Sequence, residues 1–147
     1  MTALDLETTG LDVQQDAIVA VGMVDIEGGR VRANSAYHTL VAPPKRQPMG
    51  APAIRIHGLT PDRLASAPSL AEVLPGILDR LAGRIPVVHM ADVDRPFLER
   101  ALRGVYGCGF WMPILDTAAL AAWFESNPYL TRDTDGFVQP RRLGDLA

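Results

Sequence analysis

The chain of 147 residues contains one cysteine, Cys108, and three histidines, which excludes several kinds of site. A single thiol cannot close an intrachain disulfide or build a cysteine-based zinc site, and no histidine lies in its flanking sequence to make it a nucleophile. Basic residues are not in excess either, because 14 Lys and Arg stand against 17 Asp and Glu, giving a net charge of −3. That balance excludes a strongly basic protein that coats nucleic acid without specificity.

Long apolar runs are also absent. No stretch approaches the ~18 consecutive apolar residues of a membrane span, and the first expected strand begins without a preceding signal peptide. We therefore expect a cytoplasmic protein with no membrane partner. Hydrophobic residues nevertheless make up 48 % of the chain, enough for one domain with a buried core over residues 1–147.

Apolar and polar residues alternate in the first part of the chain, as they do in half-buried strands. The pattern predicts strands over residues 3–7, 18–26 and 31–40, with a Glu-Gly-Gly-Arg hairpin turn at 27–30 between the last two. The short connections make this three-strand meander antiparallel. Four prolines then mark residues 41–52 as a loop.

The rest of the chain alternates helices with short strands, and Ser69 with Glu72 forms a capping box at the start of one helix. We expect these elements: a short helix with Thr60 as N-cap, a helix from the capping box to Gly83, a strand over 85–89, a helix over 96–105, a strand over 111–115 and a helix over 117–124. Residues 125–140 show no apolar period, and 141–147 look like the start of another helix. The sequence therefore predicts an α/β fold whose mixed β-sheet, a meander followed by parallel strands, is flanked by helices.

Two carboxylates, Asp5 and Glu7, lie two residues apart in the first strand. Residues i and i+2 of a strand face the same side, so Leu4 and Leu6 point the other way, into a core. Neighbouring carboxylates repel each other unless a positive charge lies between them, and Mg²⁺ or Mn²⁺ takes oxygen ligands. The alternative is a solvated strand face with no metal role.

The longer string Asp-Leu-Glu-Thr-Thr-Gly-Leu-Asp over residues 5–12 resembles the first motif of the DEDD exonucleases, the DnaQ-like proofreading family. The resemblance implies a ribonuclease-H-like sheet on which Asp5 and Glu7 are catalytic residues that bind two divalent cations, Mg²⁺ or Mn²⁺. An apolar side chain after the motif would stack on the terminal base of the substrate. The substrate contacts expected here are Thr8, Gly10 and Leu11.

A second segment, residues 87–98, leaves a strand and enters a helix, where α/β folds place ligands. It resembles the family pattern His-Asn-Ala-x-Phe-Asp-x-x-Phe-Leu, which implies Asp94 as the third catalytic metal ligand and Phe97 as a substrate contact. Met90 stands where Asn is usual. Asp92 is the competing ligand, unless it caps the helix, and a helix start also favours both aspartates without any metal.

Two more segments resemble elements of the same family. Ile-His-Gly-Leu-Thr over residues 56–60 resembles its Ile-His-Gly-Ile-Thr element, which implies that His57 contacts the nucleotide at the cleavage site. A surface or capping role explains a lone histidine equally well. Asp116 matches an Asp-Thr strand end, and we expect it to cap a helix or support the site rather than bind metal.

The family also needs a fourth carboxylate and a general base. One branch supplies them as His followed five residues later by Asp, but the histidines of this chain all come too early: His38, His57 and His89. In the other branch a Tyr precedes the Asp by four residues, as Tyr129 precedes Asp133. That pair comes before the helix expected at 141–147, so we interpret it as a chance match. We expect a single exonuclease-like domain of the His branch that lacks its C-terminal active-site helix.

The resemblance implies a metal-dependent 3′–5′ exonuclease that cleaves phosphodiester bonds by a two-metal mechanism and releases nucleoside monophosphates. Its partners would be single-stranded or 3′-terminal nucleic acid and a polymerase or additional domains. Two alternatives stay open. One is a diverged nucleic-acid-binding domain without turnover, which Met90 and the missing last motif favour. The other is a structural or interaction domain with no nucleotide role.

Overall fold

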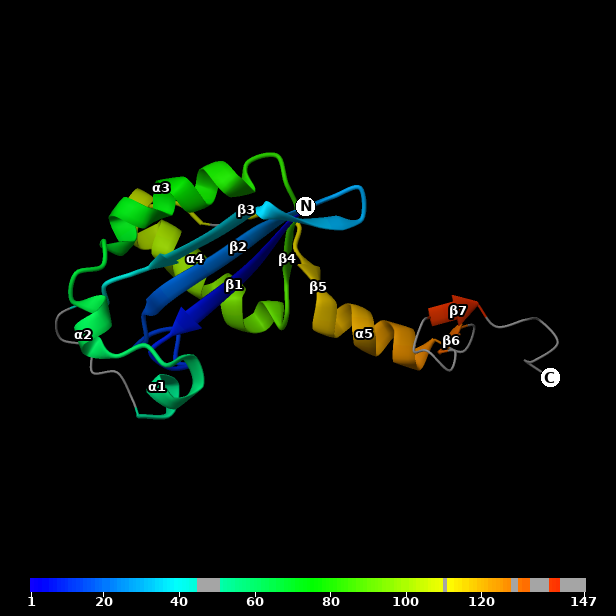
Figure 1. Ribbon diagram of the computed structural model, residues 1–147, viewed down its shortest axis with the longest axis horizontal. Helices are drawn as coiled ribbons and strands as arrows, with labels where there is room; N and C mark the ends of the chain where they lie inside the picture. The colour runs from blue at the N-terminus through cyan, green and yellow to red at the C-terminus, as the bar shows by residue number, and fades with distance from the viewer. Residues whose placement is uncertain (45–50, 110, 128–129, 133–137, 141–147) are drawn as a thin grey trace.

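The structure is a computed structural model, and it describes residues 1–44, 51–109, 111–127, 130–132 and 138–140. In chain order its elements are β1 (Thr2–Thr8), β2 (Ile18–Glu27), β3 (Arg30–Leu40), α1 (Ala51–His57), α2 (Pro61–Leu64), α3 (Leu70–Leu81), β4 (Pro86–Val88), α4 (Ala91–Tyr106), β5 (Leu115–Asp116), α5 (Thr117–Ser126), β6 (Leu130–Arg132) and β7 (Val138–Pro140). Figure 1 shows α5 leading away from the sheet.

A five-stranded sheet organises the chain, in the order β3-β2-β1-β4-β5. β1 pairs antiparallel with β2, and β2 with β3, whereas β4 lies parallel to β1 and β5 parallel to β4. The expected mixed sheet, a meander followed by parallel strands, is confirmed. The carboxyl ends of β1, β4 and β5 therefore lie at one edge of the sheet, where α4 and α5 begin.

The hairpin turn between β2 and β3 is also confirmed. Gly28 and Gly29 both have positive φ, 56° and 73°. Two consecutive residues of that conformation are what a tight hairpin needs, and glycine adopts it without a side-chain clash.

Helices α3 and α4 cover one face of the sheet (Figure 1). Leu4 and Leu6 of β1 face them beside Val21 and Met23 of β2. The helices contribute a matching set of buried side chains: Val73, Leu74, Ile77, Leu81, Phe97, Leu98, Ala101 and Leu102. Burial of a large apolar side chain is worth roughly 1.5–3 kcal/mol, so this core holds β1 and α4 together.

A smaller cluster joins the start of β2 to the segment around α2. It consists of Val19, Ala20, Leu59 and Leu64. Ala20 is the strand partner of Glu7 in β1. The segment that follows His57 therefore packs at the same end of the sheet as the paired carboxylates.

Two helix expectations need correction. Residues 51–57 form α1, although a loop was expected up to residue 52 and no helix before the one with Thr60 as N-cap; Pro52 lies in the first turn, where its missing N–H costs little. Helix α4 begins at Ala91 and not at Pro96. The helix can begin at Ala91 because Met90 has a left-handed φ of 66° and because the Asp116 carboxylate of β5 accepts the backbone N–H groups of Met90 and Ala91. The capping box is present, since the Glu72 carboxylate accepts the Ser69 backbone N–H at 2.7 Å.

The strand predictions were less accurate in the second half of the chain. The strand expected over 111–115 is confined to Leu115–Asp116, because only these residues pair with β4. Residues 130–132 and 138–140 form a two-stranded antiparallel pair in a segment where no regular element was expected. The helix expected over 117–124 is confirmed as α5, with Asp116 as its N-cap.

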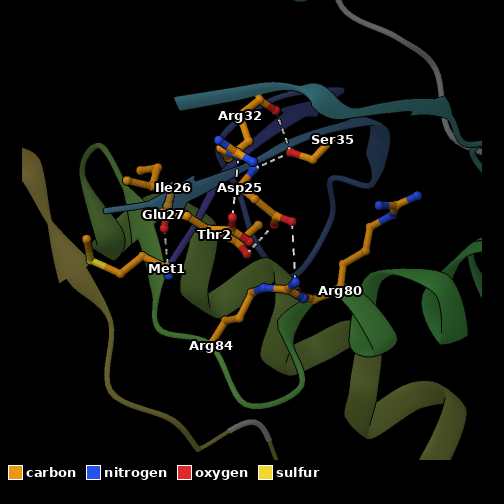
Figure 2. A network of polar contacts seen from close by, with 9 residues as sticks. All are labelled: Met1, Thr2, Asp25, Ile26, Glu27, Arg32, Ser35, Arg80 and Arg84. Carbon is orange, nitrogen blue, oxygen red and sulfur yellow. Dashed lines mark hydrogen bonds and ion pairs between the residues drawn. The ribbon is translucent and has the colours of Figure 1, made fainter. Parts of the chain in front are cut away.

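A polar network holds the amino end of β1 (Figure 2). The buried Thr2 hydroxyl donates to the Asp25 carboxylate of β2 at 2.9 Å, and the Arg84 guanidinium pairs with the same carboxylate at 3.3 Å. The Met1 ammonium donates to the Ile26 carbonyl at 3.1 Å. These contacts fix the register of β1 three residues before Asp5, at the end of the strand opposite the candidate site.

None of the helices in the described part of the chain is long and apolar enough to cross a membrane.

Candidate metal and nucleic-acid site

Asp5 and Glu7 lie on β1 on the face opposite Leu4 and Leu6, as the alternation predicts. The two leucines are buried in the core, whereas Asp5 is exposed and Glu7 is half-buried. β1 is the central strand of the sheet, so strands on both sides hold its backbone in place. The two carboxylates therefore project from a rigid element, which is a requirement for a metal or catalytic site.

Asp94 lies in the first turn of α4 and is only 5 % exposed. Burial raises the pKa of its carboxyl to about 7, and the negative charge of Asp5 adds to the rise; a hydrogen bond from the Leu6 backbone N–H acts against it, and Glu7 and Asp116 contribute smaller increases. Leu6 stands between Asp5 and Glu7 in sequence. The structure thus brings Asp94 beside both carboxylates of β1.

Asp92, the competing candidate, is exposed in the first turn of the same helix and does not cap it, because Met90 is the N-cap residue. Among the charges that act on Asp94 are Asp5 and Glu7, so the electrostatic grouping of carboxylates includes Asp94. This favours Asp94 over Asp92, and metal binding by either residue stays a prediction.

Asp116, the last residue of β5, supports the start of α4 through hydrogen bonds to its backbone. Its carboxylate accepts the backbone N–H groups of Met90 at 3.1 Å and Ala91 at 2.9 Å, and it also accepts those of Ala118 and Ala119 in α5. These bonds, that of Ala91 above all, hold the pKa of the Asp116 carboxyl below its ordinary value. Asp116 therefore caps α5, as expected, and also fixes the helix turn that carries Asp94.

A second contact reinforces the same junction. The Thr117 hydroxyl donates to the Val88 carbonyl at 3.0 Å and lies 3.0 Å from Nδ1 of His89. His89 belongs to the segment that resembles the family pattern, and it points to the neighbouring strand end. The carboxyl ends of β4 and β5 are thereby cross-linked next to Asp94.

The expected substrate contacts differ in their surroundings. Leu11 is 78 % exposed on the loop after β1, and the Thr8 hydroxyl donates to the Gly10 carbonyl at 2.6 Å. Phe97 is instead 3 % exposed and packs in the core, because its side chain lies one turn beyond Asp94 on the face of α4 that the sheet covers. Phe97 therefore packs in the core, and its contact with substrate stays a prediction.

His57 is the last residue of α1, and its Nδ1 accepts the Leu59 backbone N–H at 3.0 Å. That bond leaves the proton of a neutral ring on Nε2. Nε2 is buried and has no hydrogen-bond partner within the described residues. A buried donor without a partner is costly, and a ligand oxygen would satisfy it.

The donor set of the site suits a hard divalent cation, since the negative charges of Asp5 and Glu7 act on the buried carboxyl of Asp94. Among the described residues, however, no three His, Cys, Asp or Glu side chains are gathered closely enough to hold a metal ion. Asp5 is exposed. The three carboxylates thus influence one another electrostatically, but in the described part of the chain they do not form a closed coordination shell for a metal.

Tyr129, Asp133 and residues 141–147 lie outside the described residues, so the chance match and the expected helix are not tested. A hollow of about 540 Å³ lies between the starts of β2 and α3 and one side of α4. Phe97 and Arg100 help to line it, whereas the three carboxylates, all of them described, do not. The hollow is therefore distinct from the carboxylate site.

The contacts of Arg100 and Asp16 near the site could not be predicted from the sequence. The Arg100 guanidinium of α4 donates to the carbonyl oxygens of Val13 and Asp16, in the loop after β1. The Asp16 carboxylate in turn accepts hydrogen bonds inside that loop. Both residues look like ordinary surface charges in the sequence, and only the fold brings them together.

Comparison with known proteins gives a consistent result. The family model described as Exonuclease matches residues 2–125. The PolC-type DNA polymerase III of Thermotoga maritima is 40 % identical over 118 residues, which cover 80 % of this chain and 8 % of that protein. The DNA polymerase III subunit epsilon of Aquifex aeolicus is 31 % identical over 122 residues, which cover 80 % of this chain and 56 % of that protein. The chain thus spans less than two thirds of the length of either relative.

Solved structures resemble the chain in fold. A product-bound exonuclease I superposes with a TM-score of 0.75 at 13 % identity, over 95 % of this chain and 36 % of that one. Escherichia coli exonuclease I in complex with a dA16 oligonucleotide gives 0.71 at 14 % identity, over 95 % and 33 %. At such low identity these likenesses show a shared fold.

Proposed function

The chain belongs to the exonuclease family, and from that membership we propose that it is a 3′–5′ exonuclease acting on single-stranded ends of nucleic acid. Its sheet is ribonuclease-H-like, as expected from the sequence and as in exonuclease I. The observation that carries the proposal is the position of Asp94. Its carboxyl is buried in the first turn of α4, and the negative charges of Asp5 and Glu7 act on it.

In this proposal Asp5, Glu7 and Asp94 are the catalytic residues that hold two divalent cations, Mg²⁺ or Mn²⁺. Bound cations would supply a water of lowered pKa and would neutralise charge on the scissile phosphate. In the metal-free chain the Asp94 carboxyl, with a pKa of about 7, is partly neutral near neutral pH, so binding of a cation there would release a proton. We assign no residue of this chain to the fourth carboxylate or to the general base.

Substrate contacts come from the same end of the sheet. The exposed Leu11 offers an apolar surface on which a terminal base stacks, and Thr8 with Gly10 sets the backbone path beneath it. His57 Nε2, which has no hydrogen-bond partner within the described residues, would donate to a phosphate or sugar oxygen. The relatives are named as DNA polymerase III proteins, so we propose DNA as the substrate and a polymerase as the partner.

The test uses a single-stranded oligodeoxynucleotide labelled at its 5′ end, with Mg²⁺ or Mn²⁺. A ladder of labelled fragments that shortens from the 3′ end, with release of mononucleotides, is the expected result. Asp5→Asn and Asp94→Asn should each reduce the rate by at least about 100-fold, because each removes a negative charge that would hold the cations, and the cations stabilise the transition state. Asp92→Asn is the matched control, since Asp92 lies on the same helix turn and is exposed. An equal loss in the control would contradict the assignment of Asp94.

Metal binding can also be measured without cleavage, by thermal unfolding. Mn²⁺ should raise the melting temperature of the wild-type chain and leave that of Asp5→Asn unchanged, since a ligand that binds the folded state stabilises it. Asp5→Ala should not destabilise the metal-free chain, because it relieves repulsion among the carboxylates. A clear loss of metal-free stability would make Asp5 a structural residue.

A second candidate is a nucleic-acid-binding domain of the same fold without turnover. It is favoured by the lack of a closely gathered ligand cluster among the described residues. Binding of the oligonucleotide without shortening, at any Mg²⁺ or Mn²⁺ concentration, would support it over the exonuclease.

A further inference from the structure

The loop between β1 and β2 follows the paired carboxylates directly, and its own polar groups close it. The Thr9 hydroxyl donates to the Asp16 carboxylate at 2.7 Å, and the backbone N–H of Asp12 donates to the other oxygen of that carboxylate at 2.9 Å. Thr9 and Ala17 join the two ends of the loop through a backbone hydrogen bond of 2.9 Å. Asp16 is thus the centre around which the loop folds.

Gly10 shows how tightly Asp16 is packed. A Cβ at Gly10 would lie 2.4 Å from an Asp16 carboxylate oxygen, closer than any side chain tolerates. The Asp16 carboxylate therefore occupies the space in which residue 10 would carry a side chain. The path of the backbone through Gly10 to Leu11 depends on this contact.

Arg100 ties the same loop to helix α4. Its guanidinium donates to the Asp16 carbonyl at 2.7 Å and to the Val13 carbonyl. Arg100 lies six residues after Asp94 in one continuous helix. The loop that begins beside Glu7 is therefore fastened to the helix that carries Asp94, and not only to its own strand.

Leu11 is the residue of this loop that can contact a ligand. It is a large apolar side chain, 78 % exposed, in a loop whose backbone is bonded on both sides of it. A rigid loop with an exposed apolar residue has already lost conformational entropy before a ligand arrives, which favours binding. The distance from Leu11 to the carboxylates is then set by Asp16 and Arg100.

We propose that Asp16 and Arg100 are positioning residues, which hold Leu11 at a fixed place relative to Asp94 so that the terminal nucleotide binds in register with the carboxylates. This rests on the proposed exonuclease function. Neither residue touches the reacting atoms. A loosened loop weakens binding of the strand end and leaves the chemical step of a correctly bound end unchanged.

The test compares Arg100→Leu with Arg103→Leu in the full chain. Arg103 lies on the same helix and pairs with Glu99 at 2.6 Å, and it makes no hydrogen bond or ion pair to residues 9–17, all of which the structure describes. Its removal therefore subtracts the same charge. Arg100→Leu should raise KM for a single-stranded oligonucleotide about tenfold and change kcat by less than about twofold. Arg103→Leu should leave KM within about twofold. Arg100→Lys, with one donor group for the two carbonyls, should fall between.

Asp16→Ala should reproduce the rise in KM, because it removes both acceptors inside the loop. Equal KM values for the two arginine variants would show that only charge matters. An unchanged KM in Arg100→Leu, or a fall in kcat alone, would equally overturn the positioning role.

A readout that does not need activity separates this idea from the proposed function. Amide hydrogen exchange at Asp12 and Ala17 should quicken in Arg100→Leu and not in Arg103→Leu, since those amides are bonded within the loop. The affinity for an oligonucleotide with phosphorothioate 3′ linkages should fall by the same factor as KM rises. If the wild-type chain binds that oligonucleotide but cleaves none, the exonuclease proposal fails, and the affinities still decide the positioning role. Unchanged exchange and affinity would refute it.

Discussion

The Asp116 carboxylate accepts the backbone N–H of Ala91 at 2.9 Å, across 25 residues of sequence. Through this bond and its neighbour to Met90, the end of β5 fixes the first turn of α4, where Asp94 lies. Asp116→Ala should therefore lower the melting temperature by roughly 5 °C, as the loss of a helix cap does. It should also reduce nuclease activity more than Asp92→Ala does. Thermal unfolding and the 5′-labelled oligonucleotide assay measure the two effects, and unchanged activity would contradict the link to Asp94.

Met90 has the backbone conformation of a left-handed residue, with φ of 66°. Residues other than Gly and Asn rarely adopt this conformation, which costs of order 1 kcal/mol of conformational free energy. Met90→Asn and Met90→Gly should each stabilise the chain by about 0.5–1 kcal/mol, because Met90 is 54 % exposed and little packing is lost. Urea unfolding measures the change. A loss of stability in both variants would mean that the methionine side chain packs favourably.

Stability of the metal-free chain should depend on pH through Asp94. Its pKa is raised from 3.8 to about 7 on folding, so the folded chain holds this proton more tightly than the unfolded chain. The loss of folding stability that comes from ionising the buried Asp94 carboxyl is absent below about pH 4. It grows as pH rises toward 7 and is constant above that pH. Asp94→Asn should thus match the wild type at pH 4 and be more stable at pH 8 by roughly 2–4 kcal/mol. Urea unfolding at both pH values with a chelator present measures it, with Asp92→Asn as the control. A constant difference at both values would contradict the buried charge.

The network at the amino end of β1 offers a test of stability without activity. Thr2→Val removes the hydroxyl that donates to Asp25 and keeps the side-chain shape, so it should cost about 1–2 kcal/mol. Arg32→Met removes an ion pair whose side chains are 54 % and 58 % exposed, and it should change stability by less than about 0.5 kcal/mol. Both should cleave the oligonucleotide at the wild-type rate below their melting temperatures. If Thr2→Val and Arg32→Met lost the same free energy of unfolding, the burial of the Thr2–Asp25 hydrogen bond would not increase its contribution to stability.

Local patterns in the sequence were enough to predict the meander. Alternation in β1 to β3 and the two glycines of the hairpin turn specify strands, faces and turn together, and each agrees with the structure. The capping box of Ser69 and Glu72 was found in the same way, whereas the N-cap role of Asp116 was expected from the family resemblance. In each case the interacting groups lie within a few residues of one another.

Features that depend on distant residues were not found. The start of α4 at Ala91 needs Asp116, and the shape of the loop after β1 needs Arg100, 84 residues beyond Asp16. The burial of Phe97 was missed for a related reason, because a motif gives the residue type and not the face of the helix that the sheet covers. The grouping of Asp5, Glu7 and Asp94 was implied by resemblance, and their role with metal stays a prediction.

The burial of Asp94 decides which substitution can test its role. Its side chain is 5 % exposed, in the first turn of a helix that packs on the sheet. Alanine at this position would remove the carboxylate and also leave a space in the interior, so it would confuse loss of chemistry with loss of packing. Asparagine has nearly the same shape and removes only the charge, which makes it the substitution whose effect reports on the reaction.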